Sequence, residues 1–361
     1  MRITNSMLVS NLMKNLNTNL SSLDKLNNQM ATGRKFAHIS DDPVALVFSQ
    51  AARNKIARLS HYQRSVGSAQ DWLNQSEVGI MELQSTLVNA YESALDAAND
   101  TKTDDDRKNI AKTVSQLRDH YVDTLNTTFG DKYIFGGYNT PGDPASGFIT
   151  DGVKPFVIKE NASGESELYY NGFNLSRFDG MDANDFINMT ASTVLPDGST
   201  LSAAEFAQFQ SLSNDVLTFD VGPGINMPVT MNGFELVFFI TSDTSGNTVM
   251  RNAFNVMEEL YQNVNNGVPV NDIGTSIKPL QDGQNHLLTR TAEIGGRIRR
   301  LDLLEARYEQ DEINYSRMKS DAEDVDMAEV ILNQKMAEAV YQAALSAGAR
   351  IIQPTLMDFL R

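Results

Sequence analysis

The 361-residue sequence predicts a mainly α-helical fold with an inserted β-rich domain, in which long coiled-coil helices from both chain ends pair with each other. Apolar residues recur every three or four positions over long stretches near both ends. That spacing is typical of helices that pack lengthwise on a partner. Between about residues 139 and 250 the spacing stops, and short apolar runs alternate with turn-forming residues, which predicts strands.

The first helical stretch carries one apolar row that a single polar residue, Asn27, interrupts. One Asn in such a row can fix the register between helices at some cost in stability. We expect this helix to end at Gly33, because glycine readily adopts the left-handed conformation that closes helices. The row predicts an assembly interface made by Val9, Met13, Leu16, Leu20, Leu23 and Met30.

A second helix is predicted to begin at Pro43. Asp42 can accept the first free amide protons as the N-cap, and proline suits the first helical position. The apolar row then continues to Ala97, which predicts a helix roughly 80 Å long. A shorter helix is expected at about residues 110–125. The break between Gly33 and Pro43 therefore separates a terminal helix from an inner bundle.

The C-terminal part has a second long apolar row, from about Leu287 onward. Within it, Ser320 and Glu323 have the spacing of a capping box, which predicts a second break where a new helix starts. The alternative is a continuous helix with an acidic, solvated face. From this side, the residues expected in the assembly interface are Leu332, Met336, Ala339 and Ala343.

These elements predict three domains. Residues 1–42 and 320–361 form a terminal helical assembly domain, residues 43–140 and 250–319 a helical bundle, and residues 141–249 a β-rich outer domain. Each terminal helix has one apolar row and no evident partner in the monomer. We therefore expect the arms to be disordered in the isolated subunit and to become helical when subunits pack together.

Local patterns within the middle region predict smaller features. The pairs Asn171-Gly172 and Asn232-Gly233 lie between apolar runs, where hairpin turns are expected. The segment "YIFGGYNT" is expected to be a short strand and a tight turn that fold back on the bundle. An amphipathic helix is expected at about residues 253–264, leading back into the bundle.

Composition argues against several classes of function. A net charge of −16 disfavours nucleic acid and anionic membranes as main partners, and no segment resembles a membrane span or a cleaved signal peptide. Cysteine is absent, and the four histidines lie far apart without the H-E-x-x-H spacing. The acidic segments "GFITDG" and "DGMDANDF" lack the calcium-loop positions and are expected to be turns. We expect no catalytic residue, no cofactor and no metal site.

Several segments are recognisable: "MRITNSMLVSNLMKNLN", "LNNQMATGRKFAHISDDPVA", "DKYIFGGYNT" and the ending "AEDVDMAEVILNQKMAEAVYQAALSAGARIIQPTLMDFLR". They resemble the hook-associated protein 3 family, the hook–filament junction proteins of the flagellin superfamily. The resemblance covers about residues 1–140 and 250–361 and is weak across 145–245. It implies a flagellin-like fold and a structural subunit of the bacterial flagellum, between the hook and the filament.

The resemblance also implies partners and a location. The partners would be hook-associated protein 1, flagellin, further copies of the chain in a ring-like homo-oligomer, and a cytoplasmic flagellar export chaperone on the C-terminal helix. The protein would be extracellular, exported through the flagellar type III apparatus without a cleaved signal peptide.

Two alternatives stay open. One is a flagellin filament subunit, which would share the two-arm design. The segments "SDDPVA" and "YIFGG" favour the junction family, because flagellins typically carry an alanine-glycine run after the paired aspartates. The other alternative is an enzyme carried in the variable outer domain, which the missing H-E-x-x-H spacing makes remote.

Overall fold

The computed structural model describes residues 5–38, 40–99, 101–130, 132–137, 154–161, 164–214, 216–243 and 245–352. Its longer helices are α1 (Asn5–Thr32), α2 (Pro43–Ala97), α3 (Asp104–Leu125), α7 (Ala253–Asn265), α9 (Ile277–Glu323) and α10 (Met327–Ile352). Its shorter helices are η2 (Ser176–Phe178), α4 (Ala183–Ile187), α5 (Ala203–Ser213), α6 (Gly233–Val237) and α8 (Val270–Gly274). Its strands are β1 (Thr128–Phe129), β2 (Lys132–Tyr133), β3 (Phe156–Glu160), β4 (Ser166–Tyr170), β5 (Phe173–Asn174), β6 (Met181–Asp182), β7 (Thr218–Gly222), β8 (Ile225–Pro228), β9 (Phe238–Ser242) and β10 (Thr248–Asn252).

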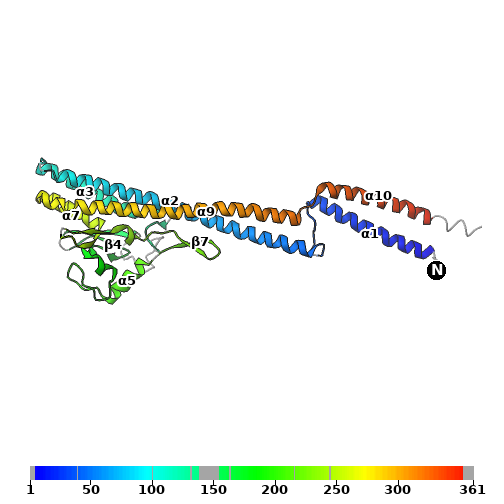
Figure 1. Cartoon of the computed structure of the whole chain (residues 1–361), viewed down its shortest axis with the longest axis horizontal. Helices are drawn as coiled ribbons and strands as arrows, with labels where there is room; N and C mark the ends of the chain where they lie inside the picture. The colour runs from blue at the N-terminus through cyan, green and yellow to red at the C-terminus, as the bar shows by residue number, and fades with distance from the viewer. Residues whose placement is uncertain are drawn as a thin grey trace, which may run out of the picture. The chain divides into compact units, whose positions relative to one another are not determined.

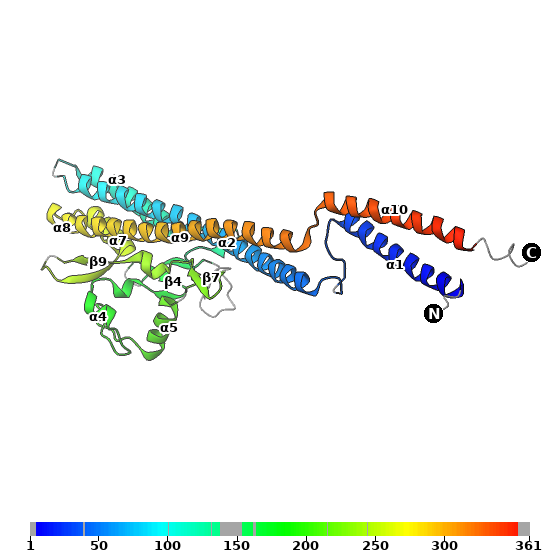
Figure 2. The ribbon, with the colours of Figure 1, turned by 45° about the vertical axis from the view of Figure 1, so that its right-hand side comes forward.

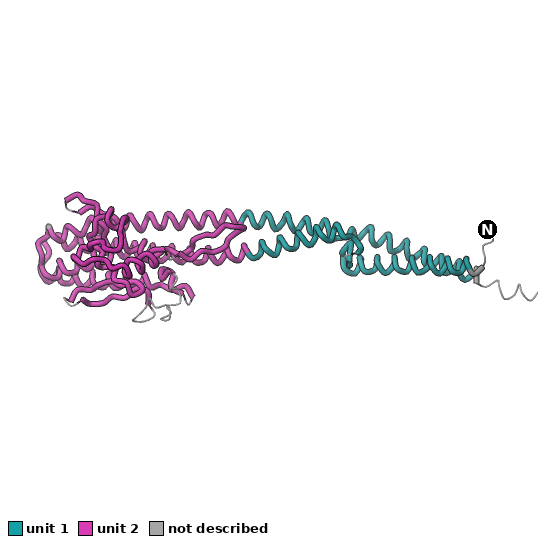
Figure 3. Tube along the Cα trace, turned by 90° about the horizontal axis from the view of Figure 1, so that it is seen from below, with its two compact units in different colours: residues 1–61, 306–361 teal, residues 62–305 magenta. Residues whose placement is uncertain are grey.

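The chain divides into two compact units (Figure 3). Unit 1 consists of residues 1–61 and 306–361, and unit 2 consists of residues 62–305. Helices α2 and α9 each contribute one part to each unit. Unit 2 contains the predicted β-rich region and most of the predicted helical bundle, whereas bundle residues 43–61 and 306–319 belong to unit 1.

The helical part of unit 2 follows the predicted apolar rows. In α2, buried residues recur seven positions apart, as in Val66, Leu73 and Ile80, which are all 0% exposed. In α9, Leu287 and Ile294 have the same spacing and are at most 1% exposed. Helix α9 begins at Ile277, ten residues before the start of the predicted apolar row at Leu287. The long helices of the sequence prediction are therefore confirmed, together with the interior that their spacing implied.

A buried ion pair joins α3 to α7. Arg118 on α3 donates hydrogen bonds to Glu258 on α7 and to Ser166 on β4, and its guanidinium carbon lies 5.7 Å from the ring centroid of Phe254. The side chains of Arg118 and Glu258 are each 10% exposed. Because a buried charge is costly unless it is paired, this contact fixes the two helices relative to each other.

The strands form small antiparallel sheets, including β3-β4-β5 and β6-β10-β9. Figures 1 and 2 show the strands together with α4 and α5 on one side of helices α2 and α9. Asn171 and Gly172 connect β4 to β5 with φ angles of 47° and 82°. Two successive positive φ angles favour Asn-Gly, so the hairpin predicted here is confirmed.

The hairpin predicted at Asn232-Gly233 is wrong. Asn232 is the N-cap of α6, where its side chain accepts a hydrogen bond from the amide of Phe234 at 3.1 Å. Gly233 is required for space, because a Cβ atom there would lie 2.3 Å from the ring of Phe156. The same two residue types thus serve a cap and a close approach rather than a turn.

The segment after α3 folds back on the bundle as predicted. Strands β1 and β2 pair, and Ile134 and Phe135 directly after them are 0% exposed. The ring of Phe135 lies against Gly79 of α2, where a Cβ atom would be only 2.9 Å from it. The amphipathic helix expected near residues 253–264 is also confirmed as α7.

In unit 1 the helices from the two chain ends lie side by side. Figures 1 and 2 both show α1 next to α10, and the two helices contact each other along their lengths. A Cβ atom at Gly348 would lie 2.8 Å from Leu12, and Gln334 donates a 3.5 Å hydrogen bond to Asn27. These pairs define an antiparallel register and confirm the predicted pairing of the terminal helices.

Candidate assembly surface

The break after α1 is built from the residues that the sequence indicated. Gly33 has a φ of +68°, and its amide donates to the carbonyl oxygen of Gln29 at 2.8 Å. Open space surrounds Gly33, so its conformation, rather than crowding, requires glycine. Asp42 accepts hydrogen bonds from the amides of Val44 and Ala45 at 3.1 and 2.9 Å, and Pro43 is the first residue of α2.

The second break lies where it was predicted, but its capping residues differ. Helix α9 ends at Glu323 and α10 begins at Met327. Asp326 caps α10 by accepting from the amide of Ala328 at 2.9 Å. The Ser320–Glu323 capping box is wrong, because both residues lie in the last turn of α9 and Ser320 donates to Asp324 instead.

The two breaks are joined to each other by backbone hydrogen bonds. Arg34 and Asp324 form an antiparallel bridge. The amide of Lys35 donates to the carbonyl oxygen of Glu323 at 2.6 Å, and the amide of Val325 donates to that of Gly33 at 3.1 Å. Two interruptions almost 300 residues apart in sequence therefore form one junction within unit 1.

The carboxylate of Glu323 is the centre of this junction. It accepts hydrogen bonds from the hydroxyl of Ser49 and from Arg53, whose Nε and Nη2 lie 2.5 and 2.7 Å away, while Arg34 lies 3.9 Å away. The Glu323 side chain is 3% exposed. Hydrogen bonding by Arg53 lowers the pKa of Glu323 to about 2. We call Glu323, Ser49, Arg53 and Arg34 the Glu323 clamp.

The interface residues predicted on α1 fall into two groups. Val9, Leu16 and Leu23 are half-buried. Met13, Leu20 and Met30 are exposed, with Leu20 at 51%. The predicted row therefore covers both the packed edge of the helix pair and an adjacent surface that remains open.

On α10 the predicted interface residues all lie on the exposed side. Leu332 and Met336 are 60% and 52% exposed, and Ala339 and Ala343 are exposed as well. A less exposed row of α10 lies two positions before the predicted one and consists of Val330, Gln334, Ala337, Tyr341, Ala344 and Gly348. The row of α9 does not continue in phase because residues 324–326 between the helices are not helical.

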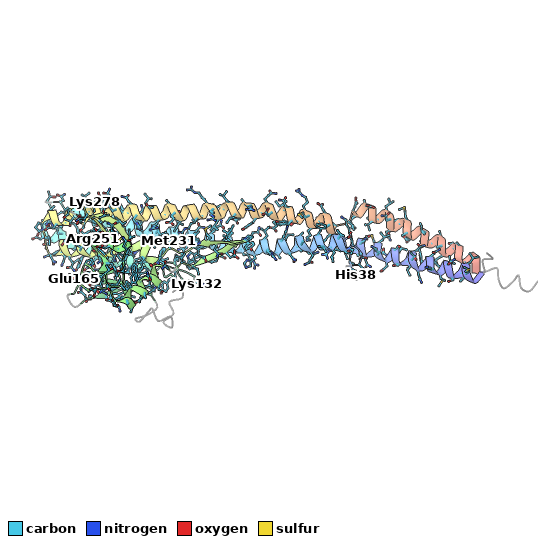
Figure 4. The ribbon with its side chains drawn as sticks, turned by 60° about the horizontal axis from the view of Figure 1, so that its bottom comes forward. His38, Lys132, Glu165, Met231, Arg251 and Lys278 are labelled. Atoms are coloured by element: carbon cyan, nitrogen blue, oxygen red, sulfur yellow. The ribbon has the colours of Figure 1, made fainter. Side chains whose placement is uncertain are left out.

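The exposed apolar residues of the helix pair form what we call the outer face: Met7, Leu8, Met13, Leu20, Met30, Met327, Ile331, Leu332, Met336, Val340 and Leu345. Few other side chains surround it. Figure 4 shows side chains from many elements crowded around Arg251 and Glu165 in unit 2, whereas α1 and α10 have only each other's. Large exposed apolar surfaces usually mark sites of contact with other molecules, so the outer face is suited to contact with other chains.

Other kinds of site find little support in the part of the chain that the structure describes. There, no group of three or more His, Asp or Glu residues is placed to hold a metal ion. The segment "DGMDANDF" is a turn only at its first two residues and continues as β6 and the start of α4, which Asp182 caps, whereas "GFITDG" lies outside the described residues. None of the described helices is both long and apolar enough to cross a membrane.

Comparison with known proteins identifies the architecture. Residues 3–140 match the bacterial flagellin N-terminal helical region. Flagellar hook-associated protein 3 of Escherichia coli strain K12 is 25% identical over 355 residues, which cover 96% of this chain and 96% of that protein. The chain is therefore similar to hook-associated protein 3 over almost its whole length. The crystal structure of Xanthomonas campestris FlgL has the same fold, with a TM-score of 0.52 at 14% identity over 74% of this chain and 99% of that one.

Similarity to a filament protein is much shorter than similarity to the family. The flagellar filament 41 kDa core protein of Borreliella burgdorferi is 28% identical over 109 residues, which cover 30% of this chain and 32% of that protein. The match to hook-associated protein 3 extends through the middle region as well as the ends. The comparison therefore favours the junction family over the flagellin alternative.

Proposed function

We propose that this protein is a structural subunit of the bacterial flagellum that forms the junction between the hook and the flagellin filament. The observation that carries the proposal is the outer face, on a chain similar over almost its whole length to hook-associated protein 3. Burying one such apolar side chain stabilises an assembly by about 1.5–3 kcal/mol. Residues such as Leu332 and Met336 therefore supply a strong drive to associate.

The outer face also suggests which partners cover it. Further copies of the chain, packed in a ring-like homo-oligomer through α1 and α10, would bury it laterally. Such a ring would contact hook-associated protein 1 on one side and flagellin on the other. Because large exposed apolar surfaces favour aggregation, a cytoplasmic export chaperone would cover α10 before assembly. Export would proceed through the flagellar type III apparatus, without a cleaved signal peptide, to the extracellular flagellum.

The proposed subunit is a structural protein without catalytic activity. The polar groups at the Glu323 clamp are satisfied by one another, as expected of a structural contact rather than of a reactive site. In this proposal the clamp ties the end of α9 to Ser49 and Arg53 of α2, with Arg34 after α1 close by, so that α1 and α10 start from fixed positions.

Deletion of the gene tests the junction role. Cells should keep intact hooks, while flagellin escapes unpolymerised into the medium because its first layer has no template. A gene carrying Leu332→Asp and Met336→Asp should fail to restore filaments. The matched control Ile187→Asp, at a 70% exposed residue of unit 2, should restore them. Normal filaments in the deletion strain would refute the proposal.

Purified protein distinguishes the junction from the flagellin alternative. A junction subunit has different neighbours above and below it, so its contacts need not repeat, whereas filament contacts propagate without closing. We expect monomers or short assemblies under salting-out conditions that polymerise flagellin, as judged by electron microscopy. Micrometre-long filaments of this protein alone would make it a flagellin.

A further inference from the structure

The side chains of this protein that oxidants attack most readily are its methionines. The sequence has 15 Met and no Cys, so every sulfur atom is a thioether. Its one Trp, Trp72, is only 5% exposed. Peroxides convert an exposed thioether to a polar sulfoxide, whereas burial protects a thioether from attack. The effect of a peroxide on the subunit therefore depends on where the methionines lie.

The methionines of the described residues fall into two groups. One group is at most 8% exposed and lies entirely in unit 2: Met181, Met189, Met227, Met231, Met250 and Met257. The other group is at least 37% exposed and, apart from Met81 of α2, lies in unit 1: Met7, Met13, Met30, Met318, Met327 and Met336. Oxidation is therefore expected to modify unit 1 and to leave the interior of unit 2 unchanged.

Methionine is also the commonest residue of the outer face. Five of the eleven residues of this face are Met: Met7, Met13 and Met30 on α1, and Met327 and Met336 on α10. An unbranched, polarizable side chain adapts to neighbours of different shape more easily than Leu or Ile does. That adaptability suits a face that packs against more than one kind of chain, but it makes the face oxidisable.

We propose that the five methionines of the outer face are an oxidative modification site, and that their conversion to methionine sulfoxide by a peroxide prevents the free subunit from assembling. Each sulfoxide adds a polar oxygen that the interface would have to bury without a hydrogen-bond donor, which opposes association. The effect on assembly rests on the function proposed above, whereas the selectivity of oxidation does not.

The reaction needs only hydrogen peroxide as the oxidant. The sulfur lone pair attacks one peroxide oxygen, a sulfur–oxygen bond forms as the oxygen–oxygen bond breaks, and the proton on the transferred oxygen leaves with the hydroxide as water. The thioether loses two electrons, and the peroxide is reduced to water. A packed neighbour would shield the thioethers, so the modification acts on the subunit before it assembles.

The selectivity is tested on the purified full chain treated with hydrogen peroxide. Peptide mass spectrometry should show that Met13 and Met336, at 56% and 52% exposed, are oxidised at least about tenfold faster than Met257, which is 0% exposed. Met81, at 51% exposed, should react as fast as Met336. Chemical denaturation of unit 2 should not change. Equal rates for Met257 and Met336 would overturn the proposal.

The effect on assembly is tested by adding purified protein and flagellin to cells of the deletion strain and counting filaments by electron microscopy. Peroxide treatment of the unaltered protein should reduce the number of filaments at least about tenfold. Methionine sulfoxide reductases A and B, which each reduce one sulfoxide epimer, should then restore it. Filaments that are as numerous with treated as with untreated protein would refute the proposal.

Two variants locate the effect. Leucine is close to methionine in volume and is a good helix former, so both variants should fold. The protected variant should still support filaments after peroxide treatment, and it carries Met7→Leu, Met13→Leu, Met30→Leu, Met327→Leu and Met336→Leu. The control carries Met81→Leu and Met318→Leu, at exposed residues outside the outer face, and should lose activity as the unaltered protein does.

The two possible failures are distinguishable. If the treated control retains its filaments, or the treated protected variant loses them, the site lies elsewhere and the proposal is wrong. If untreated, unaltered protein supports no filaments, the proposed junction role fails. In that case retention on a phenyl column decides the inference: peroxide should shorten the retention of the unaltered protein and not that of the protected variant, and an equal change in both would refute the site.

Discussion

Unit 1 and unit 2 are built from helices with the same apolar spacing, but unit 2 encloses far more of its apolar residues. In unit 2, Val66, Tyr121 and Phe254 are among many residues that are 0% exposed. Among the described apolar residues of unit 1, the least exposed is Ala52 at 2%, and Leu332 is 60% exposed. The spacing of apolar residues therefore predicts a helix and its faces, but not whether a neighbour covers each face.

The difference follows from the number of neighbours. In unit 2, helices α2, α3, α7 and α9 and the strands surround a common interior. In unit 1, α1 and α10 cover one side of each other and leave the outer face open. The polar Glu323 clamp compensates in part for the apolar packing that unit 1 lacks. We expect the stability of unit 2 to depend on packing, and the stability of unit 1 to depend on the clamp and on assembly.

The largest effect on subunit stability is expected from Phe254→Ala in α7. Phe254 is 0% exposed and its ring lies near Arg118, so its removal leaves a cavity beside a buried charge. We expect the free energy of unfolding to fall by about 3–5 kcal/mol, measured by chemical denaturation. The control Ile187→Ala, at a 70% exposed residue, should change it by less than about 0.5 kcal/mol. Equal effects would mean that unit 2 is not the stable part of the chain.

A smaller effect is expected from Glu323→Gln. The change removes the charge that pairs with Arg53, whose side chain is 39% exposed, so water compensates for part of the loss. We expect unit 1 to lose about 1–2 kcal/mol. Hydrogen exchange should accelerate in α1 and α10, but not in α7. The control Glu329→Gln, at an exposed residue of α10, should leave exchange unchanged.

The clamp also predicts a dependence on pH. The pKa of Glu323 is lowered from an ordinary value of 4.5 to about 2. Its contribution to the stability of unit 1 is therefore complete above pH 4.5 and is lost as pH falls toward 2. Hydrogen exchange of α1 and α10 should accelerate over that range in the unaltered protein. In Glu323→Gln this part of the acceleration should be missing. Identical pH profiles for the two proteins would contradict the role of the clamp.

The smallest effect on the subunit itself is expected from Leu20→Asp. Leu20 is 51% exposed, so the melting temperature of the monomer should hardly move. In an assembly the same carboxylate would be buried without a partner, so motility should be lost. Leu16→Asp, at a half-buried residue of the same helix, should lower the stability of the monomer as well. A large drop in monomer stability for Leu20→Asp would show that the outer face is already covered within the subunit.

The expected disorder of the two terminal arms in the isolated subunit stays a prediction. Pairing of α1 with α10 gives each arm one partner, but the apolar surface buried between two helices is small. Comparing hydrogen exchange of both arms with that of α7 in the monomer would show whether the pair is ordered before assembly. Protection equal to that of α7 would mean that the arms do not need neighbouring subunits to fold.

The sequence by itself determined the elements whose causes are local. Gly33, Asp42 and Pro43 end one helix and start the next through their own backbone preferences and hydrogen bonds, and Asn171-Gly172 favours its turn for the same reason. The heptad spacing also determined the long helices and which of their residues share a face. None of these features requires knowledge of what lies across the fold.

Only the tertiary structure decided the features that depend on residues distant in sequence. Gly233, the first residue of α6, must be glycine because the ring of Phe156 occupies the space where a Cβ would lie, and Glu323 is a clamp because Ser49 and Arg53 reach it from another helix. The inner face of α10 depends on the non-helical residues 324–326, which shift its phase. Local spacing specifies which residues can share a face, whereas contact with the rest of the chain selects the face that is buried.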